Sequence, residues 1–162
     1  LILILAFGFT LALQYSSPIT GAWLALAWVV SLVWLYVVWQ IHFKTGTPEG
    51  ERMAQWDIRW RYLVTTSLIL FGLYCIVNGA PISDNWLSFK IILFGTIILN
   101  GVWIRKIAAR WQPIFDKVRA GGEERVEGEA LMKVNRKSAG MANMVIWTLV
   151  MLMAFVGQTK LF

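Results

Sequence analysis

The sequence predicts an all-helical, polytopic membrane protein, with a four-helix transmembrane bundle and one truncated span before it. Residues 1–43 contain no Asp, Glu, Lys or Arg. Three further apolar stretches follow at 62–83, 86–104 and 141–159, and Lys90 is the one charged residue inside them. A soluble chain of 162 residues cannot bury so much apolar surface, whereas a lipid bilayer accommodates it.

The composition agrees with this class. The chain is 58% hydrophobic and 15% charged, whereas soluble domains average about 25% charged residues. In a soluble protein the net charge of +6 would suggest nucleic acid as a partner. Here the positive residues concentrate in two loops, so we expect the lipid bilayer as the partner of this chain, and no nucleic acid. One His and one Cys cannot form a Cys/His metal cluster, and Cys75 is expected to be a small buried hydrophobe.

Five spans are expected within a single transmembrane domain covering residues 1–162. The first is shorter than the roughly 20 residues that a span needs, and we interpret it as a span whose beginning precedes Leu1. Ser16, Ser17 and Pro18 form the expected turn after it. The expected spans cover about 1–15, 20–42, 60–78, 86–104 and 140–157.

The basic residues predict an orientation. The polar loops 43–59 and 105–138 and their flanks are rich in Lys and Arg, whereas the turns 16–20 and 79–85 contain neither. The positive-inside rule therefore places both loops in the cytoplasm, and with five spans the C-terminus lies on the other side of the membrane. We expect the second loop to continue the fourth span as an amphipathic helix ending at Gly121-Gly122, followed by a short acidic helix.

Two residues could carry chemistry. Lys90 is the candidate catalytic residue, because a charge within a span is a functional hypothesis by default. Lys90 could equally extend its amine to the lipid headgroups. No expected span contains an acidic residue, so Asp84, in the turn before this span, is the nearest candidate partner for Lys90. His42, at the end of the second span, could bind haem iron or shuttle protons, although a polar tip at the headgroups is the commoner role.

Small and polar residues in the spans are expected to let helices approach and to bond across their interfaces. The expected helix-packing residues are Gly72, Gly95, Asn100, Gly101 and Asn143. Trp28, Trp34 and Trp147 lie deeper than the interfacial tryptophans and could line a flat cofactor, although packing is the more frequent role of such residues.

Four features carry a resemblance to a known family. Trp28 and His42 keep a characteristic spacing, Arg59-Trp60-Arg61-Tyr62 leads to Phe71-Gly72-Leu73, Trp86-Leu87-Ser88-Phe89-Lys90 has the pattern Trp-Leu-x-x-Lys, and Asn135-Arg136 precede the last span. Over about residues 21–162 the chain resembles a group of small bacterial membrane proteins, which implies the bacterial inner membrane as its location and the periplasm for its C-terminus. The group includes oxygen-independent protoporphyrinogen oxidases, copper-resistance D-type proteins and the membrane domain of a urate hydroxylase.

The resemblance implies haem as a possible cofactor, with His42, Trp28 and Arg136 as candidate binding residues. The histidine that binds haem in the oxidase family corresponds to Gly21 in this chain. The resemblance therefore implies the fold without supplying the family's haem ligand.

Three functions follow as hypotheses. The absence of converging polar residues favours a non-catalytic or accessory subunit that packs beside a membrane redox or transport complex, with other membrane subunits or further copies of itself as partners. A haem-linked oxidoreductase using His42 and Lys90 is the first alternative, and it predicts a Soret band in the purified protein. A small transporter is the second, although no expected span offers a carboxylate to a cation.

Overall fold

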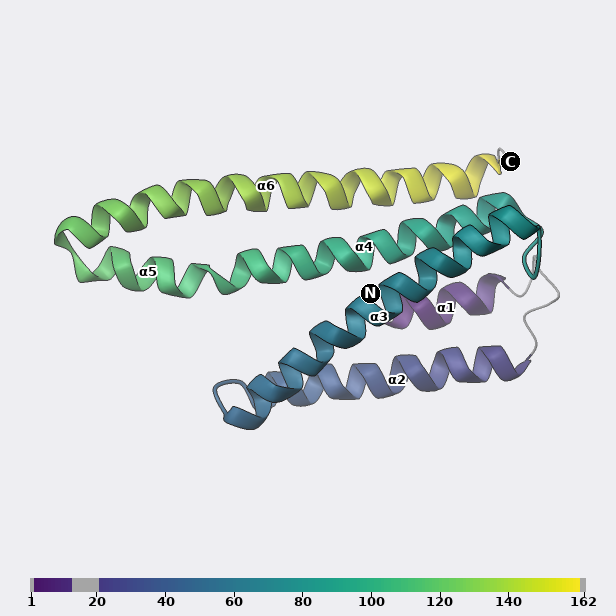
Figure 1. The fold of residues 1–162 in the computed structure, drawn as a ribbon, viewed down its shortest axis with the longest axis horizontal. Coiled ribbons are helices and arrows are strands. Elements are labelled where there is room, and N and C mark those ends of the chain that lie inside the picture. Colours follow the sequence, from purple (N-terminus) through teal and green to yellow (C-terminus); the bar gives the residue numbers. More distant parts are fainter. Residues whose placement is uncertain (1, 13–20, 161–162) are drawn as a thin grey trace.

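The computed structural model describes residues 2–12 and 21–160, which form six helical segments and no strand (Figure 1). Four stretches are long and apolar enough to cross a membrane: α2, α3, α4 continued by α5, and α6. The predicted all-helical membrane fold is therefore confirmed, while the turn expected at 16–18 lies outside the described residues. The helices are α1 (Ile2–Ala12), α2 (Gly21–Phe43), α3 (Pro48–Asn78), α4 (Asn85–Ala109), α5 (Trp111–Ala120) and α6 (Gly122–Thr159).

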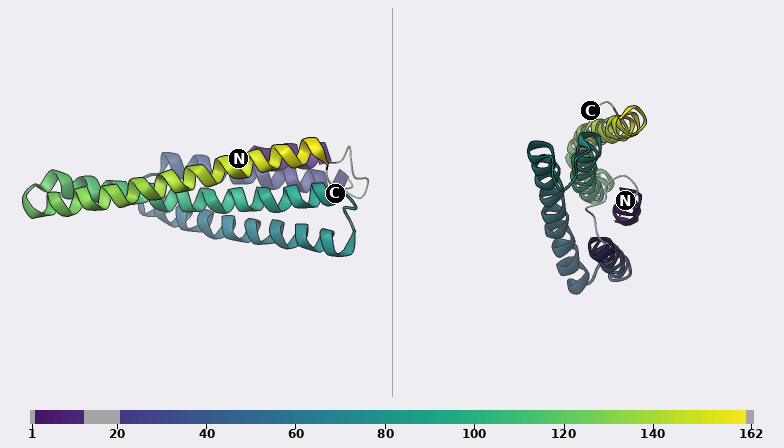
Figure 2. Two further views of the ribbon diagram at one scale, coloured as in Figure 1. Left: turned by 90° about the horizontal axis from the view of Figure 1, so that it is seen from above. Right: turned by 90° about the vertical axis from the view of Figure 1, so that its right-hand side faces the viewer.

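The helices lie roughly along one axis, and α4 is central among them (Figures 1 and 2). It packs against α3 on one side and α6 on the other, while α2 packs against α1 and α3. α3 crosses obliquely from the end of α2 to the start of α4 (Figure 1). The α5–α6 hairpin extends past the α2–α3 hairpin, so the molecule is longer on that side (Figures 1 and 2).

The segment 43–59, expected as a polar loop, is mostly helical. α3 begins at Pro48, where the fixed φ of proline suits the first helical position. The Thr47 hydroxyl caps the helix by accepting the Gly50 N–H at 3.1 Å, and Glu49 and Glu51 favour the positive helix N-terminus. The loop prediction was wrong because it took Pro48 as a helix breaker, and the span expected at 60–78 is only the second part of α3.

The segment 105–138, the other expected loop, is also almost entirely helical. The predicted amphipathic continuation exists as α5, and Gly121 and Gly122 form the turn after it with φ of +80° and +57°. The expected short acidic helix is not separate, because α6 runs unbroken through 38 residues from Gly122 to Thr159. At 1.5 Å per residue α6 is about 57 Å long, nearly twice the hydrocarbon thickness of a bilayer.

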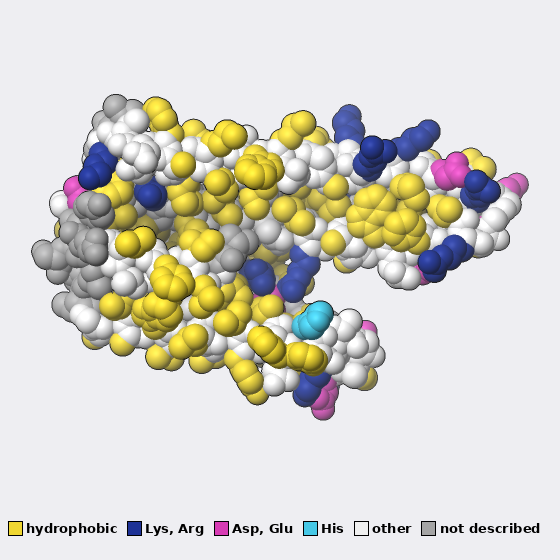
Figure 3. Space-filling model, turned by 180° about the vertical axis from the view of Figure 1, so that it is seen from behind, with side chains coloured by type: hydrophobic (Ala, Val, Ile, Leu, Met, Phe, Trp, Pro, Cys, Tyr) yellow, Lys and Arg dark blue, Asp and Glu magenta, His cyan; other side chains and the backbone are white. Residues whose placement is uncertain are grey.

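Two apolar clusters form the core. One joins Leu5, Trp34, Leu68 and Ile98 from four helices. The other lies at the end of the bundle where α3 ends and α4 begins. It contains Cys75, which is fully buried as expected. Large apolar side chains nevertheless cover much of the outer surface (Figure 3), as expected where lipid is the solvent.

Candidate functional site

A buried carboxylate lies where α2, α3 and α4 meet. Asp57 of α3 is 2% exposed, and Trp34 of α2 beside it is 4% exposed. The antiparallel α2–α3 hairpin brings these two together, because only residues 44–47 connect the helices. Arg61 lies one turn further along α3, and Arg105 extends from the last part of α4. We call these four residues the Asp57 cluster.

Three donors satisfy the Asp57 carboxylate. Trp34 Nε1 donates to Oδ1 at 2.8 Å, and Arg61 Nε donates to Oδ2 at 2.9 Å. Arg105 Nη1 donates to the same Oδ2. The Arg61 guanidinium also lies over the Trp34 ring, 5.2 Å from its centroid. Trp34 belongs to α2, Arg61 to α3 and Arg105 to α4, so the cluster ties α2 and α4 to α3.

The chemistry of the cluster suits a structural role, in which it stabilises the packing of three helices. One carboxylate faces two guanidinium groups, which offsets its charge in a buried position. Breaking such a pair leaves uncompensated charge, which is far more destabilising than breaking an exposed pair. The expected spans contain no acidic residue, but Asp57 was assigned to the loop 43–59, and that assignment was wrong because α3 begins at Pro48 and buries Asp57.

A notch separates the α2–α3 hairpin from the α5–α6 hairpin (Figure 3). Basic side chains, drawn in dark blue, lie at the base of the notch, and the one histidine of the sequence, His42, lies on its rim. His42 is exposed, with its ring edge against Phe43 at a centroid distance of 5.7 Å. This position fits the polar tip that the sequence favours over a buried ligand.

Lys90 lies at the opposite end of the bundle, in the second turn of α4. Its Nζ is 5.8 Å from the centroid of the Trp86 ring. It also lies against Gly157 of α6, where an added Cβ would be 2.7 Å from Nζ. No described carboxylate forms an ion pair with Lys90, and Asp84, its expected nearest partner, is the N-cap residue of α4.

The residues proposed to hold haem do not converge in the described structure. His42 and Lys90 lie at opposite ends of the bundle. A side chain at Gly21, the position of the family's haem histidine, would meet nothing within 4 Å. Trp28 Nε1 donates to Thr10 Oγ1 at 3.1 Å, and Arg136 is exposed on α6. Nor do the described His, Cys, Asp and Glu side chains form a group of three that could hold a metal.

The predicted packing residues lie mainly on the two faces of α4. Gly72 lets α3 approach α4, since an added Cβ would be 2.6 Å from Ile92 Cγ1, and Gly95 lies similarly against Thr65 of α3. Asn100 faces α6 and donates from Nδ2 to the Ala142 carbonyl at 3.0 Å. Gly101 is half-buried on α4, while Asn143 is exposed and lines a shallow pocket between α4 and α6.

No family model, curated protein or solved structure matches this chain. Its candidate function is therefore argued from the geometry of its own residues, and the resemblance described above stays a prediction.

Sequence reasoning did not predict that Asp57 and Asn135 join helices. The signal for Asp57 was present: Arg61 follows it by four residues, and Thr47-Pro48-Glu49 has the form of a helix start. Asn135 Nδ2 donates to the Ile107 carbonyl at 3.2 Å, joining α6 to α4. Asn135 was noted only as part of the family resemblance, and its partner could not be predicted because the contact depends on how α6 folds back from α5.

Proposed function

We propose that this integral membrane protein is an accessory, non-catalytic subunit whose α5–α6 hairpin docks the extramembrane part of a membrane redox or transport complex. The observation that carries this proposal is a set of exposed apolar side chains on a helical hairpin beyond the apolar span. They are Phe115, Val126, Leu131 and Val134, which are 41%, 71%, 40% and 65% exposed.

The hairpin is a packed structure. Gly128 of α6 lies against α5, where an added Cβ would be 2.8 Å from Val118 Cγ2. Lys117 and Glu127 form an ion pair at 2.5 Å across the two helices, and Ile114 is buried between them. Its surface therefore has a defined shape, as a docking element requires.

Lipid does not account for Val126, the most exposed of these side chains. Val126 precedes Gly140, the expected start of the last span, by 14 residues, which corresponds to about 21 Å of helix. The headgroup layer adds only about 5–8 Å on each side of the hydrocarbon core. Val126 thus lies well beyond the bilayer when α6 crosses it, and an exposed apolar side chain in water favours contact with protein.

Site-specific photocrosslinking in native membranes tests the proposal. A photoreactive amino acid at Val126 or Val134 should give one discrete protein adduct, of the same partner from both positions. The matched control is Val150, which is 45% exposed on the apolar half of the same helix and should label mainly lipid.

Substitution of both valines by Glu should abolish co-purification of that partner while leaving the chain folded in the membrane. An adduct of twice the chain's own mass would indicate docking of a second copy instead of another subunit. Labelling of lipid alone at Val126 would contradict the proposal.

A further inference from the structure

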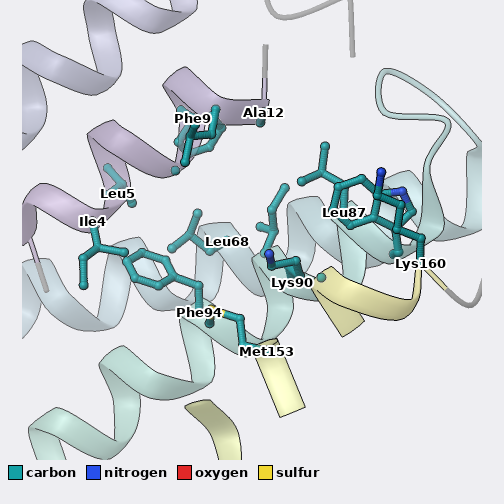
Figure 4. Close-up of a pocket in the computed structure, with 15 residues that line it drawn as sticks. Ile4, Leu5, Phe9, Ala12, Leu68, Leu87, Lys90, Phe94, Met153 and Lys160 are labelled. Atoms are coloured by element: carbon teal, nitrogen blue, oxygen red, sulfur yellow. The ribbon is translucent and has the colours of Figure 1, made fainter. Parts of the chain in front are cut away.

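A pocket of about 400 Å³ lies between α1, α4 and α6 at the end of the bundle that carries Lys90 (Figure 4). Its volume is within the usual range for small-molecule sites. Most of its lining is apolar, with Ile4, Leu5 and Phe9 from α1 facing Leu68 and Phe94. The apolar lining alone would accept any hydrocarbon chain.

The polar groups of the pocket are confined to one end. This end of the pocket, near the last residues of α6 and the first of α4, is lined by Lys90, Lys160 and Trp86. Phe94 lies one turn further along α4 than Lys90, and Ile4 lies two turns before Ala12 on α1. The lining therefore changes from cationic and aromatic at the end of the bundle to wholly apolar towards its middle. A single bilayer leaflet has the same gradient, from headgroup to acyl chain.

The Lys90 side chain lies within this pocket. It is half-buried, points among the apolar residues in Figure 4, and passes beside Gly157 of α6, where an added Cβ would be 2.7 Å from the amine nitrogen at the flexible end of the side chain. A cation among apolar groups is unfavourable unless it is paired, and the described carboxylates do not pair with it. An anion entering the pocket would supply that pairing.

We propose that this pocket binds an anionic phospholipid, with the phosphate on the Lys90 amine and an acyl chain along the apolar wall formed by α1, Leu68 and Phe94. A neutral hydrocarbon would fill the apolar part but bring no negative charge to Lys90. A soluble phosphate would pair the amine but leave the apolar part empty. An anionic phospholipid satisfies both parts of the lining at once.

Native mass spectrometry of the full chain in mild detergent tests this proposal, with phosphatidylglycerol and phosphatidylcholine added in separate titrations. The wild-type protein should bind one phosphatidylglycerol about fivefold or more tightly than phosphatidylcholine, because the choline cation offsets the phosphate charge that Lys90 would pair with, and phosphatidylglycerol has no such cation. Lys90→Met should remove this preference, and Lys90→Arg should retain it.

Lys106→Met is the matched control, because Lys106 lies on the same helix, is exposed, and donates to the Tyr62 hydroxyl at 3.0 Å at the other end of the bundle. It should leave the preference unchanged. Equal binding of the two lipids, or an unchanged preference in Lys90→Met, would overturn the proposal. Displacement of the lipid by an equal concentration of glycerol phosphate would overturn it too, by showing a phosphate site that needs no acyl chain.

Discussion

At one end of the bundle the Asp57 carboxylate accepts hydrogen bonds from Trp34, Arg61 and Arg105. About 22 Å away along α4, the Lys90 amine has a tryptophan ring and a glycine as neighbours, and no described carboxylate. Both charges lie within the helical bundle. The first is satisfied by its own chain, so its role is to fix three helices. The second has no carboxylate partner among the described residues, and this difference is the basis of the proposed anionic phospholipid site.

The largest expected effect comes from removing the satisfied charge. Asp57→Ala should lower the free energy of unfolding by about 3 kcal/mol, at the low end for a buried ion pair because Arg105 is partly exposed. Titration with a denaturing detergent, followed by far-UV circular dichroism, would measure this. Asp116→Ala is the control, because Asp116 and Arg119 form an exposed pair at 4.0 Å, and its change should stay within about 0.5 kcal/mol. Equal losses of unfolding free energy in the two variants would contradict the stabilising role of the Asp57 cluster.

A smaller loss is expected at the Lys90 end, where close backbone approach holds α3 to α4. A Cβ at Gly72 would lie 2.6 Å from Ile92 Cγ1 and 2.9 Å from the Ser88 carbonyl oxygen, so Gly72→Ala should destabilise the protein by about 2 kcal/mol. Gly140→Ala provides the contrast, since a Cβ there meets nothing within 4 Å, and it should stabilise α6 by about 0.5–1 kcal/mol. The same unfolding titration measures both variants, and a loss in both would show that the helix contact is not the cause.

The smallest effect is expected for an ion pair in water. The Lys44 amine lies 2.8 Å from Glu49, and this hydrogen bond raises the pKa of Lys44 above its ordinary value of 10.5. A raised pKa stabilises the folded state below that ordinary value, and the stabilisation is lost as the pH rises through the folded-state pKa. Glu49→Gln should therefore lower the Lys44 pKa in an NMR titration and lower the detergent midpoint at neutral pH only slightly, because the pair is exposed. A loss as large as that of Asp57→Ala would show that an exposed pair stabilises this protein as much as the buried one does.

The spans could be predicted from sequence because each is a long run of apolar residues, and such a run needs no knowledge of its neighbours. Gly72, Gly95 and Asn100 could be identified as packing candidates for the same reason, since small and amide residues stand out in an apolar span. Their partners could not be predicted, because a contact such as Asn100 with Ala142 joins residues 42 apart in the chain.

The Asp57 cluster was missed because the polar composition of residues 43–59 was taken as evidence of a loop. Asp57 lies among charged residues, and only the helix start at Thr47-Pro48 makes it part of a transmembrane helix. The pocket at Lys90 was not predictable either, because it needs α1, α4 and α6 at fixed separations. Lys90 itself could be singled out, whereas the glycine that makes room for it could not.

The unbroken course of α6 connects the two ends of the protein through one element. No proline interrupts its 38 residues, so the half that crosses the apolar region and the half that forms the hairpin belong to one continuous helix. A tilt of the whole helix by about 10° around Gly140 would carry Val126 sideways by about 4 Å, given the rise of an α-helix. A displacement at the tip of the hairpin would thus reach Gly157, beside Lys90, along a single helix.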